Sequence, residues 1–509
     1  MSKIYDLSVS LRPDNMENSD LNVFSITHEE AARIFAKRCQ VKVSDLPQTS
    51  FFATEQIELR SHVGTHLDAP YHFYPTSEGH PSKFIHEVPL QWCIGDGVIL
   101  DFRHKKPPDS ITEHDIAEEL DRISHTLKQD DIVALWTGGT DHYDDDPQFA
   151  EAATGMASSA LNYLFRCGVK VVAIDSATID LPIPLMTERL LKGDKSAYFP
   201  IHRAGRLTEW THAEKLTNFE SLPGSSGYKF ILLPIKILRG TGAWIRAVAI
   251  EDEWLMNGSY RLIDLTLPIM NYSFESEESR IVTIHHDQNQ RAKAKRLRRL
   301  VHEIVHLGSM DIVSTNTHAG THVVAPYHFG PTVNGAPAQT LDEIPLDWFY
   351  GDGVLLDFSM EKRIGEAISV ADLKGKLERI DYRLKNHDIV LIRSGADEHF
   401  ADNPNFPDLA IRLERAALFW LLDQGVRVVG SDSESLDGPV APMVEALRTG
   451  KKDQFFPIHY AGREREFCLI HKMDLHSLSC THGFKVAAFP IKLERCGAAW
   501  TRAVAIVKS

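Results

Sequence analysis

Four residues that could bind a metal ion and activate water lie close together in the segment SHVGTHLDAPYHF, residues 61–73. They are His62, His66, Asp68 and His72. Histidine and carboxylate side chains are common ligands of Zn²⁺, and a neutral imidazole beside an activated water can accept its proton. The spacing therefore predicts a metal site. The alternative is a cluster of histidines that only pack together, because some of the 25 histidines in this chain will lie close together by chance.

The backbone around this cluster is predicted to be a strand followed by a bend. TEQIELRSH, residues 54–62, alternates apolar and polar side chains as a half-buried strand does. Gly64 and Pro70 interrupt any continuous helix, so helical i, i+4 spacing does not explain the histidines. We expect the chain to bend at Gly64 and so bring the first ligands together.

The chain is an internal duplication. THLDAPYHF at 65–73 returns as THVVAPYHF at 321–329, and GDGVILDF at 95–102 returns as GDGVLLDF at 351–358. Self-similarity at a fixed offset indicates repeated structural units. We predict two homologous domains, residues 1–253 and 254–509, of which the first carries a complete site.

Each half is predicted to be mixed α/β. DIVALW (131–136) and DIVLIR (388–393) are short apolar runs typical of buried strands. Residues 149–167 repeat apolar side chains at helical spacing before Gly168, and the second half repeats this pattern from Leu409 to Gly425. HEEAARIF, from residue 28, predicts the start of a helix that covers the first site.

Composition excludes several classes of protein. The 55 Lys and Arg against 70 Asp and Glu give a formal net charge of −15, which argues against nucleic acid or an anionic membrane as partner. No apolar run reaches membrane-spanning length, and the N-terminus lacks the pattern of a signal peptide. Six cysteines without Cys-x-x-Cys spacing fit reduced thiols, so a cytoplasmic location is expected.

The motifs HVGTHLDAPYH (62–72), GVILDF (97–102) and AIDSATID (173–180), with a distant His-x11-Glu pair, resemble the metal-dependent cyclase family of bacterial kynurenine formamidase and isatin hydrolase. The resemblance covers both halves. It implies swivelling β/β/α domains and metal-assisted opening of an amide or lactam by water. It further implies that the two halves form an internal pseudo-dimer, and a further oligomer stays open.

Carried over to this chain, the resemblance implies a binuclear centre of zinc or manganese. Its implied metal ligands are His62, His66, Asp68, His202 and Glu214. Asp68 and Glu214 would be shared by both ions, and His72 matches the catalytic histidine. His202 and Glu214 come from the resemblance alone, because their spacing is that of an ordinary loop.

The second half departs from this pattern. It retains His318, His322, His328 and His459, but Val324 replaces Asp68 and His471 replaces Glu214. Valine cannot bind a metal, so a binuclear site of the same design cannot form there. We predict that this half has lost catalysis, although four of its histidines could still hold one Zn²⁺. They are His318, His322, His459 and His471.

These residues predict a metal-dependent hydrolase of a small-molecule amide, lactam or ester, with metal-activated water and His72 as general base. Two alternatives stay open. One is a biosynthetic cyclase or dehydratase that uses the same metals, and the other is a non-catalytic scaffold or binding protein. The substrate itself stays open, because residues 12–25 and 270–279 lack the Trp-containing aromatic segment of the formamidases.

Overall fold

The computed structural model describes residues 2–12, 22–143, 149–276, 278–305 and 307–508. The chain forms two compact units that exchange segments. Unit 1 contains residues 1–22, 58–258 and 281–313, and unit 2 contains residues 23–57, 259–280 and 314–509. Each unit is therefore completed by a segment from the other sequence half. The division at residues 253 and 254 stays a prediction about the repeats.

Unit 1 is built on a nine-stranded sheet in the order β1-β13-β11-β7-β8-β9-β10-β4-β12. Its strands are β1 Lys3–Asp6, β4 His66–Asp68, β7 Ile94–Asp101, β8 Ile132–Trp136, β9 Val171–Ile174, β10 Thr211–Glu214, β11 Lys229–Ile231, β12 Gly242–Trp244 and β13 Val248–Glu251. β7, β8, β9 and β10 run parallel, and β4 pairs antiparallel with β10. The parallel part of the sheet thus ends at β10, where the histidine segment joins as the antiparallel strand β4.

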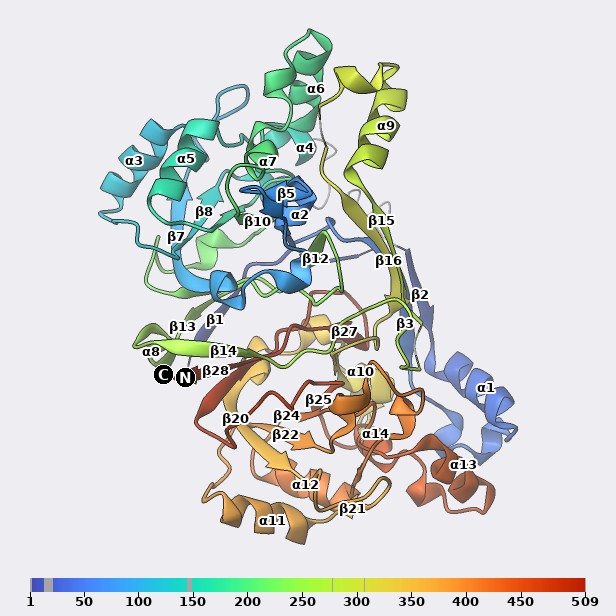
Figure 1. Ribbon diagram of the computed structural model, residues 1–509. Helices are drawn as coiled ribbons and strands as arrows, with labels where there is room; N and C mark the ends of the chain where they lie inside the picture. The colour runs from blue at the N-terminus through green and yellow to red at the C-terminus, as the bar shows by residue number, and fades with distance from the viewer. Residues whose placement is uncertain (1, 13–21, 144–148, 277, 306, 509) are drawn as a thin grey trace. The chain divides into compact units, whose positions relative to one another are not determined.

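Helices cover the parallel strands because those strands are apolar on both faces. Helices α3 (Glu113–Arg122) and α5 (Ser158–Arg166) pack against each other beside β7 and β8 (Figure 1). Leu100, Leu120 and Leu164 belong to the buried core between these elements. α7 (Pro200–Ala204) also contributes to this core and carries His202.

Unit 2 repeats this architecture with a nine-stranded sheet in the order β14-β28-β26-β20-β22-β24-β25-β17-β27. Its strands are β14 Tyr260–Asp264, β17 His322–Val324, β20 Tyr350–Asp357, β22 Ile389–Arg393, β24 Val428–Ser431, β25 Cys468–His471, β26 Phe484–Ala487, β27 Ala498–Trp500 and β28 Val504–Lys508. Its main covering helices are α11 Val370–Arg379, α12 Arg415–Asp423 and α14 Pro457–Ala461. The predicted α/β fold and its tandem duplication are confirmed.

The exchanged segments carry matching elements. Residues 23–57, in unit 2, hold most of β2 (Asn22–Ile26), helix α1 (His28–Cys39) and part of β3 (Thr54–Arg60). Residues 281–313, in unit 1, hold most of β15 (Arg280–Ile284), helix α9 (His286–Leu297) and part of β16 (Met310–Asn316). The helix expected from residue 28 exists, but it belongs to unit 2. Its counterpart in unit 1 is α9.

The helix expected over residues 149–167 is broken into α4 (Phe149–Ala152) and α5. Gly155 lies so close to Asp180 that a Cβ would come within 2.1 Å of its carbonyl oxygen, and Met156 pairs with Ile111 as an isolated bridge. The segment between the helices is therefore extended. Gly168 and Gly425 adopt the left-handed conformation expected of helix caps, with φ of 85° and 91°.

The α-helices and strands not yet named are mostly short. They are α2 Pro70–Phe73, α6 Ile183–Leu191, α8 Glu253–Met256, α10 Pro326–Phe329, α13 Val440–Arg448, β5 Thr76–Ser77, β6 His80–Pro81, β18 Thr332–Val333, β19 Ala336–Pro337, β21 Ala367–Ile368 and β23 Arg412–Leu413. Among the described residues, no helix has the length and apolar character needed to cross a membrane.

Candidate metal centre

The histidine segment of unit 1 enters the sheet through a bend. Gly64 has a φ of +65°, a conformation that glycine adopts without strain, and its carbonyl accepts a hydrogen bond from His66 Nδ1 at 2.8 Å. The chain then continues as β4, so that His66 lies opposite Glu214 of β10. The bend predicted at Gly64 is present, and it sets His66 and Asp68 on one strand.

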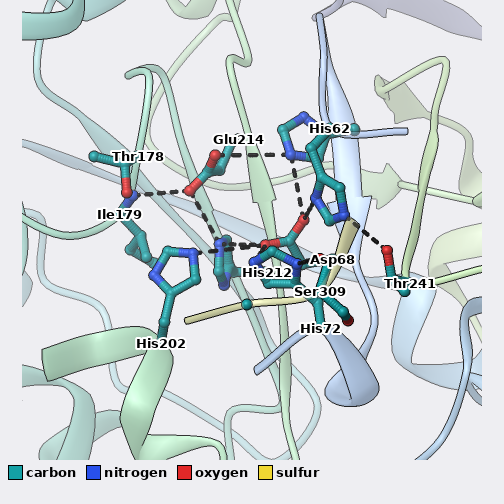
Figure 2. A network of polar contacts seen from close by, with 12 residues as sticks. His62, Asp68, His72, Thr178, Ile179, His202, His212, Glu214, Thr241 and Ser309 are labelled. Carbon is teal, nitrogen blue, oxygen red and sulfur yellow. Dashed lines mark hydrogen bonds and ion pairs between the residues drawn. The ribbon is translucent and has the colours of Figure 1, made fainter. Parts of the chain in front are cut away.

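Asp68 lies at the centre of the cluster. Its side-chain oxygens are close to one ring nitrogen of each of five histidines: His62 at 2.6 Å, His66 at 3.2 Å, His72 at 3.5 Å, His202 at 3.8 Å and His212 at 3.2 Å. Glu214 lies beside it, with its oxygens 3.1 Å from His212 Nε2 and 3.7 Å from His66 Nε2. Figure 2 shows how the labelled side chains of His62, His72, His202, His212 and Glu214 converge on Asp68.

Hydrogen bonds on the outer side of the rings orient three of the histidines. The Nδ1 atoms of His66, His72 and His202 face the Gly64 carbonyl, the Ser309 carbonyl and the Asp180 carboxylate. These oxygens accept hydrogen bonds, so each Nδ1 carries the proton and each Nε2 presents a lone pair toward Asp68. The three rings are thereby prepared to bind a cation or accept a proton on their inner side.

The pKa values reflect two carboxylates buried among imidazoles. Burial by itself would raise the pKa of Asp68, but His72, His62 and His212 hold it well below its usual range. Burial also opposes ionisation of Glu214, yet the hydrogen bond and charge of His212 lower its pKa to about 2. Asp68 and Glu214 overcome burial and raise the pKa of His212 to about 10. The pocket thus strongly favours a positive charge between the carboxylates.

His72 is the exception in this cluster. Burial, only partly opposed by Asp68, holds the pKa of His72 well below its usual value. The ring is therefore neutral near pH 7, and its Nε2 lone pair can accept a proton.

Possible metal ligands form two groups, and within each group the ligand atoms lie within 4.8 Å of one another. One contains Asp68, His202, His212 and Glu214, and the other contains His62, Asp68 and His72. The structure thus brings together all six residues predicted from the sequence, although their individual roles stay predictions. His66 contacts both carboxylates without belonging to either group.

The sequence prediction missed His212. This residue is fully buried, and its Nδ1 has no hydrogen-bond partner among the described residues. It lies two positions before Glu214 on β10, and residues at that spacing share one face of a strand. The sequence THAE, taken as a strand, would have indicated that His212 and Glu214 point the same way.

The corresponding place in unit 2 holds five histidines, with Val324 and His471 at the positions of Asp68 and Glu214. They are His318, His322, His328, His459 and His471, all buried or nearly so. Burial holds the pKa values of His318, His322, His328 and His471 well below the usual range. Among the described residues, the two groups with ligand atoms within 4.8 Å both lie in unit 1.

An apolar pair replaces the central ion pair of unit 1. In unit 2, Val324 pairs directly with Leu469 across β17 and β25, and both side chains are fully buried. The equivalent residues in unit 1 are Asp68 and His212, with side chains 3.2 Å apart. The exchange removes both members of a buried charged pair together, which avoids leaving one charge unpaired.

The buried carboxyl group of Glu55, in unit 2, is expected to make the free energy of unfolding depend on pH. It is 1% exposed and accepts hydrogen bonds from Gly497 N and Thr317 Oγ1, and burial raises its pKa to about 7 from 4.5. Because the folded pKa lies above the unfolded one, its stabilising effect is fully present below pH 4.5 and is lost as the pH rises through 7.

Glu55→Gln should therefore remove on the order of 3 kcal/mol of this pH dependence. The measurement is the free energy of unfolding in urea between pH 4 and pH 8. Glu58→Gln, at an exposed position of the same strand, is the matched control. Parallel pH profiles of the free energy of unfolding for the Glu55→Gln variant and the wild type would contradict a raised pKa of Glu55 in the folded protein.

Comparison with known proteins gives one family. The family model "Putative cyclase" matches residues 5–181 and 263–438. An isatin hydrolase from Roseibium aggregatum is 26% identical over 211 residues, which cover 40% of this chain and 76% of that protein. A kynurenine formamidase from Geobacillus thermodenitrificans is 27% identical over 194 residues, covering 38% and 77%.

The solved structures each cover about half of this chain. A crystal structure of an isatin hydrolase bound to the product analogue thioisatinate covers 50% of this chain and 95% of its own, with 18% identity and a TM-score of 0.39. The structure of a protein from Bacillus stearothermophilus, described as a predicted metal-dependent hydrolase, covers 50% of this chain and 100% of its own, with 17% identity and a TM-score of 0.33.

Proposed function

Because the chain belongs to the cyclase family, we propose that it is a metal-dependent hydrolase of a small-molecule amide, lactam or ester. The names of the relatives support a hydrolase and suggest lactams and N-formyl amines as the first substrates to test. The observation that carries the proposal is the convergence of five histidines on Asp68, with Glu214 beside it.

The residues present fit a divalent metal. Asp68 and Glu214 are ionised, and the inward Nε2 atoms of His66 and His202 offer lone pairs beside them. His62 and His212 complete the donor set, and mixed imidazole and carboxylate ligands suit Zn²⁺ or Mn²⁺. When bound, such ions polarise a carbonyl and lower the pKa of a water molecule.

His72 is proposed as the general base. Its Nδ1 donates to the Ser309 carbonyl, so the lone pair of Nε2 is available on the side of Asp68. His72 Nε2 takes a proton from the attacking water and then delivers it to the leaving nitrogen or oxygen of the opened bond. The Ser309 carbonyl keeps the ring oriented in both steps and stabilises the charge it gains.

Metal content provides the first test. We expect about two Zn or Mn ions per chain, by plasma mass spectrometry, in protein purified without chelator or a metal-affinity tag. A third ion would place metal in the histidine cluster of unit 2. No metal after reconstitution would contradict the proposal and favour a scaffold or binding protein.

A substrate panel tests the reaction. N-formyl arylamines, lactams and lactones should be screened with the metal-loaded enzyme, and we expect hydrolysis of at least one class that a chelator abolishes. Hydrolysis of none would favour a cyclase or dehydratase with the same metal site. A cytoplasmic location and the absence of nucleic-acid partners stay predictions of the sequence.

A further inference from the structure

A buried carboxylate from the second repeat reaches the outer side of this centre. Asp311 is fully buried in unit 1 and lies at the start of β16. Its Oδ2 accepts hydrogen bonds from the backbone N of Thr241 at 2.6 Å and from Thr241 Oγ1 at 2.8 Å. Ser61 Oγ also donates to Oδ2 at 3.3 Å, and Thr283 Oγ1 donates to Oδ1 at 2.8 Å. The carboxylate of Asp311 thus accepts four hydrogen bonds, from Thr241, Ser61 and Thr283.

Thr241 passes this constraint to His62. The Thr241 Oγ1 atom lies 3.1 Å from His62 Nε2. A hydroxyl has one proton to donate, and the proton of Thr241 is committed to the Asp311 carboxylate, which can only accept. Thr241 must therefore accept from His62, so His62 Nε2 carries the proton. His62 Nδ1 in turn donates to Asp68 Oδ1 at 2.6 Å, so Nδ1 is the nitrogen on the side of the carboxylates that a metal ion could bind in exchange for its proton.

We infer that Asp311, acting through Thr241, is a positioning residue of the metal centre that fixes His62 in the tautomer with Nδ1 as its ligand atom. The inference rests on the proposed function and deepens it. Carboxylates that orient a metal-binding histidine in this way govern the affinity for the ion. The second repeat, which carries Val324 and His471 in place of Asp68 and Glu214, therefore supplies part of the first repeat's site.

Other contacts of the same segment support this role. Ser309, two residues before Asp311, accepts the hydrogen bond from His72 Nδ1, and His286 of α9 contacts the Tyr71 carbonyl through its Nε2 at 2.8 Å. Gly308 packs so tightly that a Cβ there would lie 2.5 Å from the His72 ring. Segment 281–313 thus holds both His62 and His72 by their outer sides.

The second unit provides an internal comparison. Glu55 occupies the position of Asp311 and binds Thr317 Oγ1 and Gly497 N, so the buried acid is retained. Gly497 occupies the position of Thr241, however, and has no hydroxyl to contact His318. The Nε2 of His318 is buried without a hydrogen-bond partner among the described residues. The relay is thus missing in the unit that also lacks the metal-binding carboxylates.

The test is the affinity for Zn²⁺ and Mn²⁺ of the full-length protein, measured by competition with a chromophoric chelator. Asp311→Asn and Thr241→Val should each weaken binding by about 10-fold to 100-fold. Thr241→Ser, which keeps the hydroxyl, should restore wild-type affinity. The double variant should lose no more than either single variant, because both changes break one relay.

Glu55→Gln is the matched control, since it removes an equally buried carboxylate at the matching position of unit 2, and it should leave metal affinity unchanged. Equal loss in Glu55→Gln and Asp311→Asn, or wild-type affinity in Asp311→Asn and Thr241→Val, would overturn the positioning role alone. A wild-type protein that binds neither ion would overturn the metal centre and this role together.

Discussion

His72→Ala is expected to lower kcat by about 10²-fold to 10⁴-fold, while both metal ions stay bound. The reason is that His72 presents its Nε2 lone pair beside Asp68, held there by the Ser309 carbonyl, and alanine offers no group to accept the proton. The measurement pairs steady-state kinetics on the best substrate of the panel with metal analysis of the same preparation.

His328→Ala is the matched control for this experiment. His328 occupies the equivalent position in unit 2, where its Nδ1 also bonds a backbone carbonyl, that of Ala53. We expect kcat to be unaffected by this change. Wild-type turnover in His72→Ala would remove His72 from the mechanism. Loss of one ion together with turnover would instead make His72 a ligand, in keeping with its proximity to His62 and Asp68.

The double variant Asp68→Val/His212→Leu should bind no metal and have no detectable turnover. It should remain folded, because Glu214 keeps its hydrogen bond from the Ile179 backbone N and its contact with His66. It installs in unit 1 the apolar pair that unit 2 carries at Val324 and Leu469, on strands of the same pairing. Asp68→Val alone should be more harmful to stability, by about 3–5 kcal/mol, because it leaves His212 buried without its main partner.

Urea unfolding of the metal-free proteins, with the chelator present throughout, measures this difference without the contribution of bound ions. The single variant His212→Leu completes the cycle and gives the coupling between the two side chains. Additive losses in stability would show that Asp68 and His212 do not act as a pair. Metal retained by the double variant would contradict the central position of Asp68.

Much of the fold was predictable from local features of the chain. The strand expected at residues 54–62, which forms over Thr54–Arg60, follows from alternation of apolar and polar side chains. The bend at Gly64 and the left-handed glycines after the helices follow from the backbone freedom of glycine. The helix over residues 149–167 was wrong in its middle, because the approach of Gly155 to Asp180 overrides the local helical pattern. Tertiary packing decided that segment, and no spacing along the chain indicated it.

The sequence by itself determined the duplication, the α/β class and the cluster from His62 to His72, since these depend on residue types and short spacings. Only the tertiary structure decided that His212 lies between Asp68 and Glu214, and that Asp311 and Ser309 support the site from the other repeat. Such contacts depend on which strands become neighbours. That choice is made by burial of the whole sheet and by the exchange of segments between units, neither of which local sequence patterns encode.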